Sequence, residues 1–295
     1  MTNISFVIPA YNAASTLAES VGSIFDGNID DHDEVLIVND CSTDDTAKVI
    51  SDLVRRYPSK ITAITNTENK GCPASRNIGI RASKNPLIFN LDSDNILPRN
   101  SVAALKNALL SENADVATFK DYYYFKTDTS MVTHKWICQA GIFTLASLFS
   151  GMVNPAPGGN FLYKRSVWEK VGGYWEYGKG LHEAWGFCLK LLINGARFTV
   201  VPDTFYFHRY SHESLFVREN NKVNESIKIT RKFIGPAFHL LNEKSLNYIS
   251  TEPRWFDKLE THPLFCKDGS VGKNGKIVFT STLKQILYSL KKMFK

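Results

Sequence analysis

Two carboxylates follow an apolar run in the segment FNLDSDNILP, residues 89–98. If the run is a strand, Asp92 and Asp94 point to the same face, because side chains two residues apart in a strand do so. Two carboxylates that converge repel each other unless a cation or a hydrogen-bond donor lies between them. The spacing therefore indicates a site that gathers a cation and the group that this cation binds.

The elements that must position these carboxylates alternate between apolar strands and helices. Strands are expected over residues 4–9, 34–40, 61–65, 87–92 and 114–119, and helices over 14–25, 43–57, 73–83 and 98–111. Near-continuous apolar strands separated by helices predict a parallel sheet covered on both faces. Further along come a strand and a short helix within 158–174, a helix and a strand within 182–202, and a mostly helical pattern after about 215.

Polar side chains stand where three of the expected strands end. In sheets of this kind, ligands bind beyond the carboxyl ends of the strands. We therefore expect these side chains to gather at one edge of the sheet: Tyr11, Asn12, Asn39, Asp40, Asp92 and Asp94.

Composition narrows the class of protein. The 295 residues are 43% hydrophobic and 22% charged, which is ordinary for a globular chain of one large domain or one domain with an appendage. The net charge of +6 is too diffuse to argue for nucleic-acid binding. The five cysteines form no CxxC pair, so neither a disulfide framework nor a zinc site is expected.

The start of the chain and its longest apolar stretch bear on location. The start, MTNISFVIPAYN, lacks a basic leader and enters a strand directly, so no signal peptide is expected. The stretch over 136–153 contains Gln, Ser and Gly, and we interpret it as buried or facing the substrate and not as a bilayer span. We therefore expect a cytoplasmic location, either free or peripheral on the inner face of the cell membrane.

Five segments, in order, carry a resemblance to a known family: FVIPAYN, VNDCSTDDT, NKGCPASRNIGI, NLDSDN and GGYWEYGKGLHEAWGFCLKL. Over about residues 3–215 the chain resembles a GT-A glycosyltransferase of the family 2 type. The resemblance implies an α/β GT-A fold, with a Rossmann-like, mostly parallel nucleotide-binding sheet and helices on both faces. It also implies a domain over 1–215, divided into a nucleotide-binding half (1–120) and an acceptor and catalytic half (121–215), followed by a mostly helical extension over 216–295.

The resemblance gives the aspartate pair a role as a DxD motif. Asp94 is then a ligand of Mn²⁺ or Mg²⁺, and Asp92 faces the ribose. His212 either is a second ligand of this cation or has a structural role. Hard divalent cations prefer carboxylate oxygens and stabilise a diphosphate leaving group as Lewis acids. The donor-binding residues that the resemblance implies are Pro9, Ala10, Tyr11, Asp40, Arg76, Asp92, Ser93, Asp94, Gly159, Asn160 and Arg209.

Several of these roles have alternatives. Tyr11 either stacks on the base or packs against protein, and Asp40 is expected to bind the base edge although Asn39 replaces the acid that usually precedes it. Arg76 either contacts the diphosphate or braces the carboxylates. Arg209 is expected in a loop that closes over the diphosphate. Trp175 and Trp185 either stack on a sugar ring or pack in the core.

The base that takes the acceptor proton is the least regular part of the resemblance. The family usually has a Glu-Asp pair opening a helix, and here Glu183 is followed by Ala184. Three readings follow. Glu183 serves as the base, a neighbour such as His182 or Glu176 replaces it, or the domain binds the donor without competent chemistry.

The resemblance implies an inverting glycosyltransferase that moves a sugar from a nucleotide-sugar, by default a UDP-sugar, to a saccharide or lipid-linked saccharide acceptor in surface polysaccharide or glycolipid synthesis. One alternative is a nucleotide-sugar-binding or scaffolding subunit. A less favoured alternative is a nucleotidyltransferase, which would carry a Gly-rich start with a basic residue after the first strand, where IPAYNAAST has none.

The end of the chain, over residues 282–295, has the pattern of a basic amphipathic helix. Leu283, Ile286, Leu287, Leu290, Met293 and Phe294 fall on one helical face, and lysines occupy other positions. Such a helix either lies on an anionic membrane surface or docks on protein.

Overall fold

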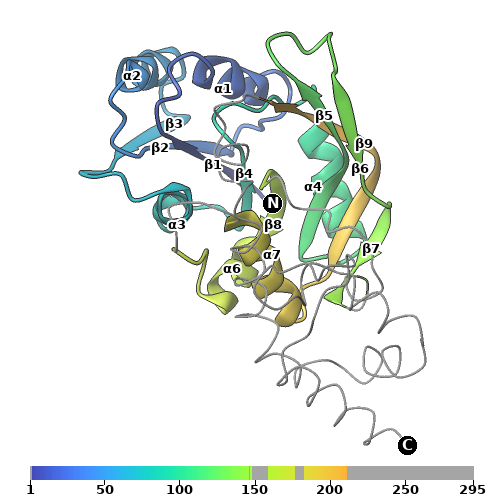
Figure 1. Ribbon diagram of the computed structural model, residues 1–295. Helices are drawn as coiled ribbons and strands as arrows, with labels where there is room; N and C mark the ends of the chain where they lie inside the picture. The colour runs from blue at the N-terminus through green and yellow to red at the C-terminus, as the bar shows by residue number, and fades with distance from the viewer. Residues whose placement is uncertain (1, 146, 148–158, 177–182, 211–295) are drawn as a thin grey trace, which may run out of the picture.

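The computed structural model describes residues 2–145, 147, 159–176 and 183–210 (Figure 1). The predicted extension over 216–295 with its amphipathic tail, and the candidate residues His182 and His212, lie outside the described residues. Among the described residues, no helix is long and apolar enough to cross a membrane.

The first half of the chain alternates strands and helices as the sequence predicts. Its elements are β1 (Ile4–Ala10), α1 (Leu17–Phe25), β2 (Glu34–Asn39), α2 (Thr46–Arg56), β3 (Ile61–Thr65), α3 (Cys72–Ala82), β4 (Leu87–Asn90), α4 (Ser101–Ser111) and β5 (Val116–Phe125). The strands form because their residues are apolar on both sides: every residue of β1 and of β4 is buried. Helices α1, α2 and α4 start three residues later than expected, because polar turns precede them, and α3 starts one residue earlier.

Among its described residues, the second half adds four strands and the helices α6 and α7. These are β6 (His134–Ile137), β7 (Gly141–Phe143), β8 (Phe161–Lys164), α6 (Arg165–Val171), α7 (Glu183–Ile193) and β9 (Phe198–Arg209). Helix α6 ends at Gly172, whose φ of 71° is the left-handed conformation that closes many helices. Both the strand and short helix expected within 158–174 and the helix and strand expected within 182–202 are thereby confirmed.

The strands form a single sheet in the order β3-β2-β1-β4-β8-β5-β9-β7, with β6 paired to β5. Strands β1 to β4 are parallel, as predicted. Strand β5, which the sequence placed in the same parallel sheet, is separated from β4 by β8, and β8 runs antiparallel to both neighbours. The sheet is therefore mixed beyond β4, and β8 brings the residues just before it alongside the end of β4.

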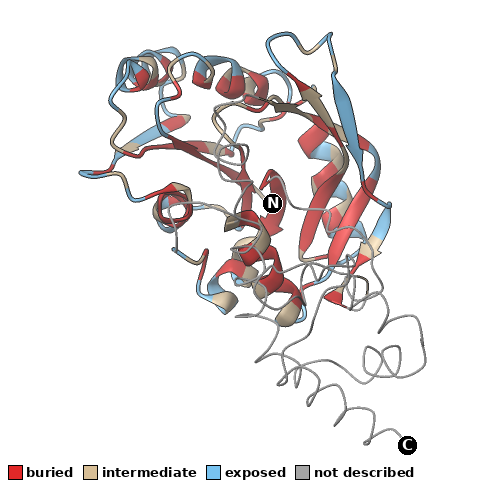
Figure 2. Ribbon diagram, viewed as in Figure 1, coloured by how far each residue is buried: buried red, intermediate tan, exposed pale blue. Residues whose placement is uncertain are grey.

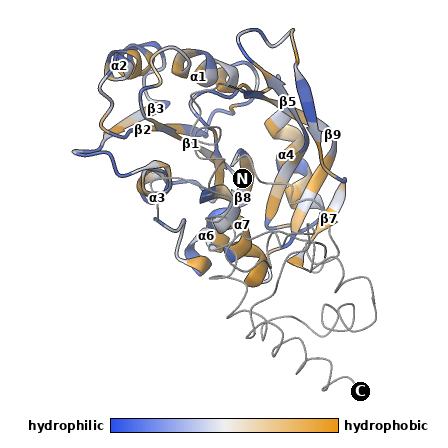
Figure 3. Cartoon of the chain, in the orientation of Figure 1, coloured by the Kyte–Doolittle hydropathy of each residue, from blue (hydrophilic) through white to orange (hydrophobic). Residues whose placement is uncertain are grey.

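Helices cover both faces of the sheet, as expected, and each face has its own core. One core packs α1, α2 and α4 against alternate strand residues such as Phe6, Ile8 and Phe89. The other core packs α3, α6 and α7 against the strand residues that point to the opposite face, such as Val7 and Ile88. The buried and apolar strands between these helices are visible in Figures 2 and 3. Burial on both faces fixes the strand ends, and with them the polar residues that follow.

Candidate active site

The loops after β1 and β2 are joined at the predicted edge of the sheet. Ala10 and Asn39 are register partners at the ends of these strands, and the Asp40 amide donates to the Ala10 carbonyl at 2.8 Å. Asn12 Oδ1 accepts a hydrogen bond from the Thr43 amide at 2.8 Å. Tyr11 lies in this joined region with 49% of its surface exposed, so its ring is available to a ligand.

Asp40 is buried and holds the loop that leads into α3. Its carboxylate accepts hydrogen bonds from Asn66 Nδ2 at 2.8 Å, from the Lys70 amide at 2.8 Å and from the Gly71 amide at 2.7 Å. A carboxylate has about four acceptor positions, so these contacts occupy most of them. The expected contact with a nucleotide base stays a prediction, and the role visible in the structure is to fix the start of α3.

Asp92 is held on every side. Its Oδ1 forms an ion pair with Arg76, and its Oδ2 accepts hydrogen bonds from Asn95 Nδ2 at 3.1 Å and Asn160 Nδ2 at 3.0 Å. Its amide donates to Asn160 Oδ1 at 2.7 Å, and its carbonyl accepts from Ser20 Oγ at 2.8 Å. The first carboxylate of the pair is therefore immobilised before any ligand arrives.

Asp94 differs, since its carboxylate receives no hydrogen bond from another described residue. Burial, and then the charge of Asp92, raises the pKa of Asp94 to about 7, while Arg209 opposes the rise. A divalent cation would relieve this cost, because it favours the charged form of the carboxylate. The described residues hold no cluster of three metal-binding side chains, and the candidate ligand His212 lies outside the residues that were searched for one.

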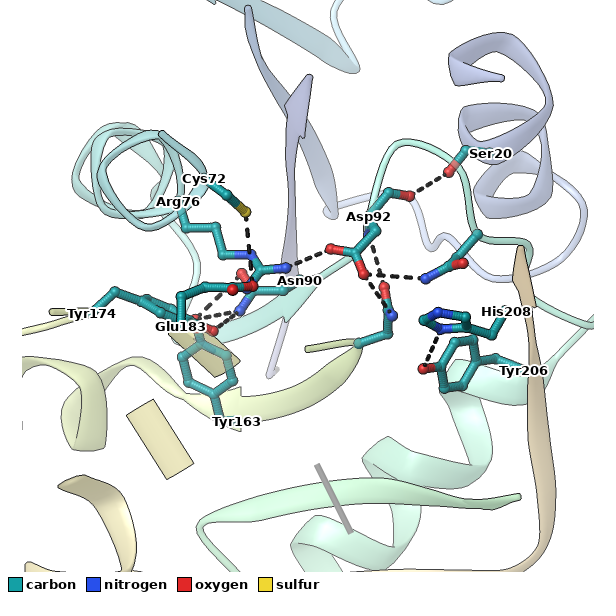
Figure 4. Close-up of polar contacts among 12 residues, drawn as sticks. Ser20, Cys72, Arg76, Asn90, Asp92, Tyr163, Tyr174, Glu183, Tyr206 and His208 are labelled. Atoms are coloured by element: carbon teal, nitrogen blue, oxygen red, sulfur yellow. Dashed lines mark hydrogen bonds and ion pairs between the residues drawn. The ribbon is translucent and has the colours of Figure 1, made fainter. Parts of the chain in front are cut away.

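Arg76 connects Asp92 to the start of α7 (Figure 4). Its side chain is 1% exposed, with Nη2 paired to Asp92 and Nη1 lying 2.8 Å from Glu183 Oε1. Its guanidinium also lies over the Tyr174 ring, 5.4 Å from the centroid. Of the two predicted roles, the structure shows the second, in which Arg76 holds the carboxylates in place. Each terminal nitrogen of the guanidinium binds one carboxylate, a geometry to which arginine is suited.

Glu183 is the first residue of α7, and its position explains the departure at Ala184. The Glu183 carboxylate faces Arg76, whereas Ala184 is 4% exposed and packs inward, where a charged side chain would be costly. Burial raises the pKa of Glu183 above its ordinary value, with Arg76 opposing and the Asp92 charge adding to the rise. The alternative Glu176 instead accepts a hydrogen bond from Asn77 at 2.8 Å and is about half exposed.

Three other predicted donor-binding residues hold the site's own groups in place. Gly159 has a φ of 75°, and a Cβ there would lie 2.8 Å from Arg76 Nη2, so glycine permits the close approach. Asn160 binds Asp92, as described above, and Arg209 donates from Nε to the Asp94 carbonyl at 3.0 Å. Ser93 lies between the aspartates and is partly exposed. Direct contact of these residues with a donor stays a prediction.

Sequence reasoning missed several polar residues that build the site. Ser20 and Asn95 bind Asp92, and Asn77 accepts hydrogen bonds from Trp168 Nε1 and the Tyr174 amide at 3.0 and 2.9 Å. Small polar residues in helices and loops give no sequence signal of such distant partners. The Asn that directly follows the aspartate pair in LDSDN was the one available hint.

Tyr206 and His208 form a further polar pair beside Asp92 (Figure 4). The Tyr206 hydroxyl lies 3.2 Å from His208 Nδ1. Burial lowers the pKa of His208 to about 4, with the Asp92 charge opposing, so the imidazole is neutral near pH 7. Trp185 packs against the core beneath α7, which favours the packing interpretation of that residue.

The mixed sheet with helices on both faces is the fold of GT-A glycosyltransferases. The family model described as Glycosyl transferase family 2 matches residues 5–172, more than half of the chain. The chain belongs to this family.

Curated relatives and solved structures agree with this assignment. The chain is similar to glycosyltransferase GlyG of Streptococcus pneumoniae, with 32% identity over 42% of this chain and 41% of GlyG. It is also similar to the poly(ribitol-phosphate) beta-N-acetylglucosaminyltransferase TarP of Staphylococcus aureus, with 22% identity over 70% of this chain and 62% of TarP. The chain thus spans less than two thirds of the length of either relative.

Two solved structures share the fold. S. aureus TarS 1-349 in complex with UDP-GlcNAc matches with a TM-score of 0.64 and 17% identity, over 89% of this chain and 70% of TarS 1-349. The mannosyltransferase PcManGT of Pyrobaculum calidifontis, in complex with GDP-Man and Mn²⁺, matches with a TM-score of 0.61 and 18% identity, over 87% of this chain and 73% of that one.

Proposed function

We propose that this chain is a metal-dependent, inverting glycosyltransferase that transfers a sugar from a nucleotide-sugar, by default a UDP-sugar, to a saccharide or lipid-linked saccharide acceptor. The relatives support the class of reaction, since TarP is named for N-acetylglucosamine transfer and TarS was solved with UDP-GlcNAc. Another relative is named a minor teichoic acid biosynthesis protein, which supports a role in surface polysaccharide synthesis.

The observation that carries the proposal is the contrast between the two aspartates. The Asp92 carboxylate forms an ion pair with Arg76 and accepts hydrogen bonds from Asn95 and Asn160. The Asp94 carboxylate, in contrast, accepts no hydrogen bond from another described residue. A partly buried carboxylate with a raised pKa is a group prepared for a cation. When bound at Asp94, Mn²⁺ or Mg²⁺ would neutralise charge on the diphosphate leaving group.

Glu183 is the proposed base. It takes the proton of the acceptor hydroxyl as that hydroxyl attacks the anomeric carbon from the face opposite the diphosphate. Its raised pKa brings it closer to neutrality, where a base is both ionised and basic enough to accept a proton. The neighbouring Cys72 thiol, 3.9 Å from Glu183 Oε1, stays protonated because burial raises its pKa well above the ordinary value. It therefore adds no negative charge beside the base.

Tyr11 and the backbone around Pro9 and Ala10 are the proposed wall for the nucleotide base. The exposed ring of Tyr11 supports this role, because aromatic rings stack on flat heterocycles and this ring is accessible to one. Asp40 and Ser93 complete the proposed nucleotide contacts.

A thermal-shift panel tests the donor assignment. We expect one nucleotide-sugar, with UDP-sugars first in the panel, to raise the melting temperature in the presence of Mn²⁺ and to do so less without it, because binding to the native state stabilises it. A transfer assay with that donor and saccharide acceptors then tests catalysis. Binding without transfer or donor hydrolysis would support the scaffolding alternative, and no binding of any nucleotide-sugar would contradict the proposal.

Membrane contact through residues 282–295 stays a prediction. A vesicle-flotation assay with anionic phospholipid vesicles would compare the full chain with one that ends at Thr282. Equal flotation of the two chains would contradict membrane binding by the tail.

A further inference from the structure

Arg209, at the end of β9, joins three separate segments around the aspartate pair. Its Nε donates to the Asp94 carbonyl at 3.0 Å, its Nη1 donates to the Lys126 carbonyl at 3.0 Å, and its Nη2 forms an ion pair with Glu19 of α1. The guanidinium carbon lies 4.5 Å from the centroid of the Phe125 ring. Only 12% of the side chain is exposed.

The backbone of Arg209 holds the same loop from a second point. Its amide donates to Asn95 Oδ1 at 2.9 Å, and Asn95 Nδ2 in turn donates to Asp92 Oδ2 at 3.1 Å. Ser20, which follows Glu19 in α1, donates to the Asp92 carbonyl at 2.8 Å. The loop that carries both aspartates is therefore fastened on one side by α1 and on the other by β9.

These contacts use three of the five N–H groups of the guanidinium, one on each nitrogen. Each of its three nitrogens already donates to the protein, and each partner is a carbonyl or a carboxylate. An arginine that released these contacts to bind a diphosphate would leave the carbonyl of the partly buried Asp94 without this donor, which carries a cost in free energy.

We propose that Arg209 is a positioning residue, which fixes the backbone of Asp94 and thereby the direction in which the Asp94 carboxylate presents itself to a divalent cation. This inference depends on the proposed function, because it assigns the cation to Asp94. Replacement of a group that orients a metal ligand commonly lowers metal affinity by about 10–100-fold.

The chain offers a matched control in Arg165. Its Nε donates to the Asn85 carbonyl at 3.0 Å, its Nη1 to the Ile80 carbonyl at 2.8 Å, and its Nη2 to the Ser83 carbonyl at 2.7 Å. It thus binds three carbonyls, but at the end of α3 and away from the aspartate pair. Replacement of either arginine by methionine keeps the aliphatic stem and removes the same kind of contacts.

The experiment measures Mn²⁺ affinity in the presence of UDP, by titration with detection of free Mn²⁺ by electron paramagnetic resonance, well below the melting temperature of every variant. We expect Arg209→Met to weaken Mn²⁺ binding by about tenfold or more, and Arg165→Met to leave it unchanged while lowering the melting temperature. Arg209→Lys should recover part of the affinity, because a single ammonium replaces one of the three contacts.

Glu19→Gln provides a second variant, in case Arg209→Met does not fold. It weakens the ion pair that holds the Arg209 side chain, and it changes a residue at the surface. We expect it to weaken Mn²⁺ binding by less than Arg209→Met does. Equal affinity in wild type, Arg209→Met and Glu19→Gln would overturn the positioning role while leaving the proposed function intact. A wild-type chain that does not bind Mn²⁺ with UDP would overturn both.

Discussion

Arg76 and Glu183 form an ion pair, with 2.8 Å between Nη1 and Oε1, although 107 residues separate them in the sequence. The same guanidinium binds Asp92, so one buried cation holds Asp92 at one end and the proposed base at the other. This arrangement fixes the positions of Asp92 and Glu183 relative to each other. It also makes both carboxylates depend on one residue.

Removal of that residue should destabilise the chain. Arg76→Met leaves two carboxylates without their cation, while the side chains of Asp92 and Glu183 are only 25% and 16% exposed. We expect the free energy of unfolding to fall by about 3–5 kcal/mol, the usual result of breaking a buried pair from one side. Urea unfolding measures this. Arg55→Met is the control, since its pair with Asp52 is exposed on α2 and should contribute little. Equal stability of the two variants would show that Arg76 does not hold the site.

The base assignment predicts a pH dependence. Glu183 must be ionised to accept a proton, and burial raises its pKa above the ordinary 4.5. We therefore expect kcat to rise with pH through a pKa above 4.5 and to level off once Glu183 is ionised. Glu183→Gln should lower kcat by about 10²–10⁴-fold and remove this limb of the profile.

Glu176→Gln is the matched control for the base. Glu176 is about half exposed and binds Asn77 and Arg81 in place of Arg76. Its replacement should leave kcat and the pH profile near those of the wild type. If Glu176→Gln abolishes transfer and Glu183→Gln does not, the base is misassigned.

A pair of glycine variants separates backbone strain from damage to the site. Gly159 and Gly172 have nearly equal φ values of 75° and 71°, but a Cβ at 159 meets Arg76 Nη2 at 2.8 Å and a Cβ at 172 meets nothing within 4 Å. Both alanine variants should lose about 1–3 kcal/mol of stability through the left-handed backbone. Only Gly159→Ala should also lower kcat, because it displaces Arg76 from its carboxylates. Transfer assays and urea unfolding check both effects, and equal kcat in the two variants would contradict this role of Gly159.

The sequence predicted the first half of the fold and the gathering of polar residues at the strand ends. These depend on apolar runs and strand direction, which are local properties of the chain. The insertion of β8 between β4 and β5 was not predictable in this way. Its register partners, such as Leu162 with Phe89, are far apart in the sequence, and only tertiary packing selects them.

The candidate site shows the same limit at the level of single residues. Asp92 and Asp94 stand out by type and spacing, and Arg76 and Glu183 by their places in the resemblance. Whether Arg76 and Arg209 bind the donor or hold the site together depends on partners 16 to 190 residues away. Ala184, a departure in the sequence, has a simple cause in the structure, because its helical position faces the core and that of Glu183 faces Arg76.

The central claim is that Asp94 binds a divalent cation together with the diphosphate of the donor. Isothermal titration of UDP into the chain, with and without saturating Mn²⁺, tests it in wild type and in Asp94→Asn, which keeps the shape of the side chain and removes its charge. We expect Mn²⁺ to strengthen UDP binding by about tenfold or more in the wild type and to have almost no effect in Asp94→Asn. An equal effect of Mn²⁺ on UDP binding in both chains would contradict the account.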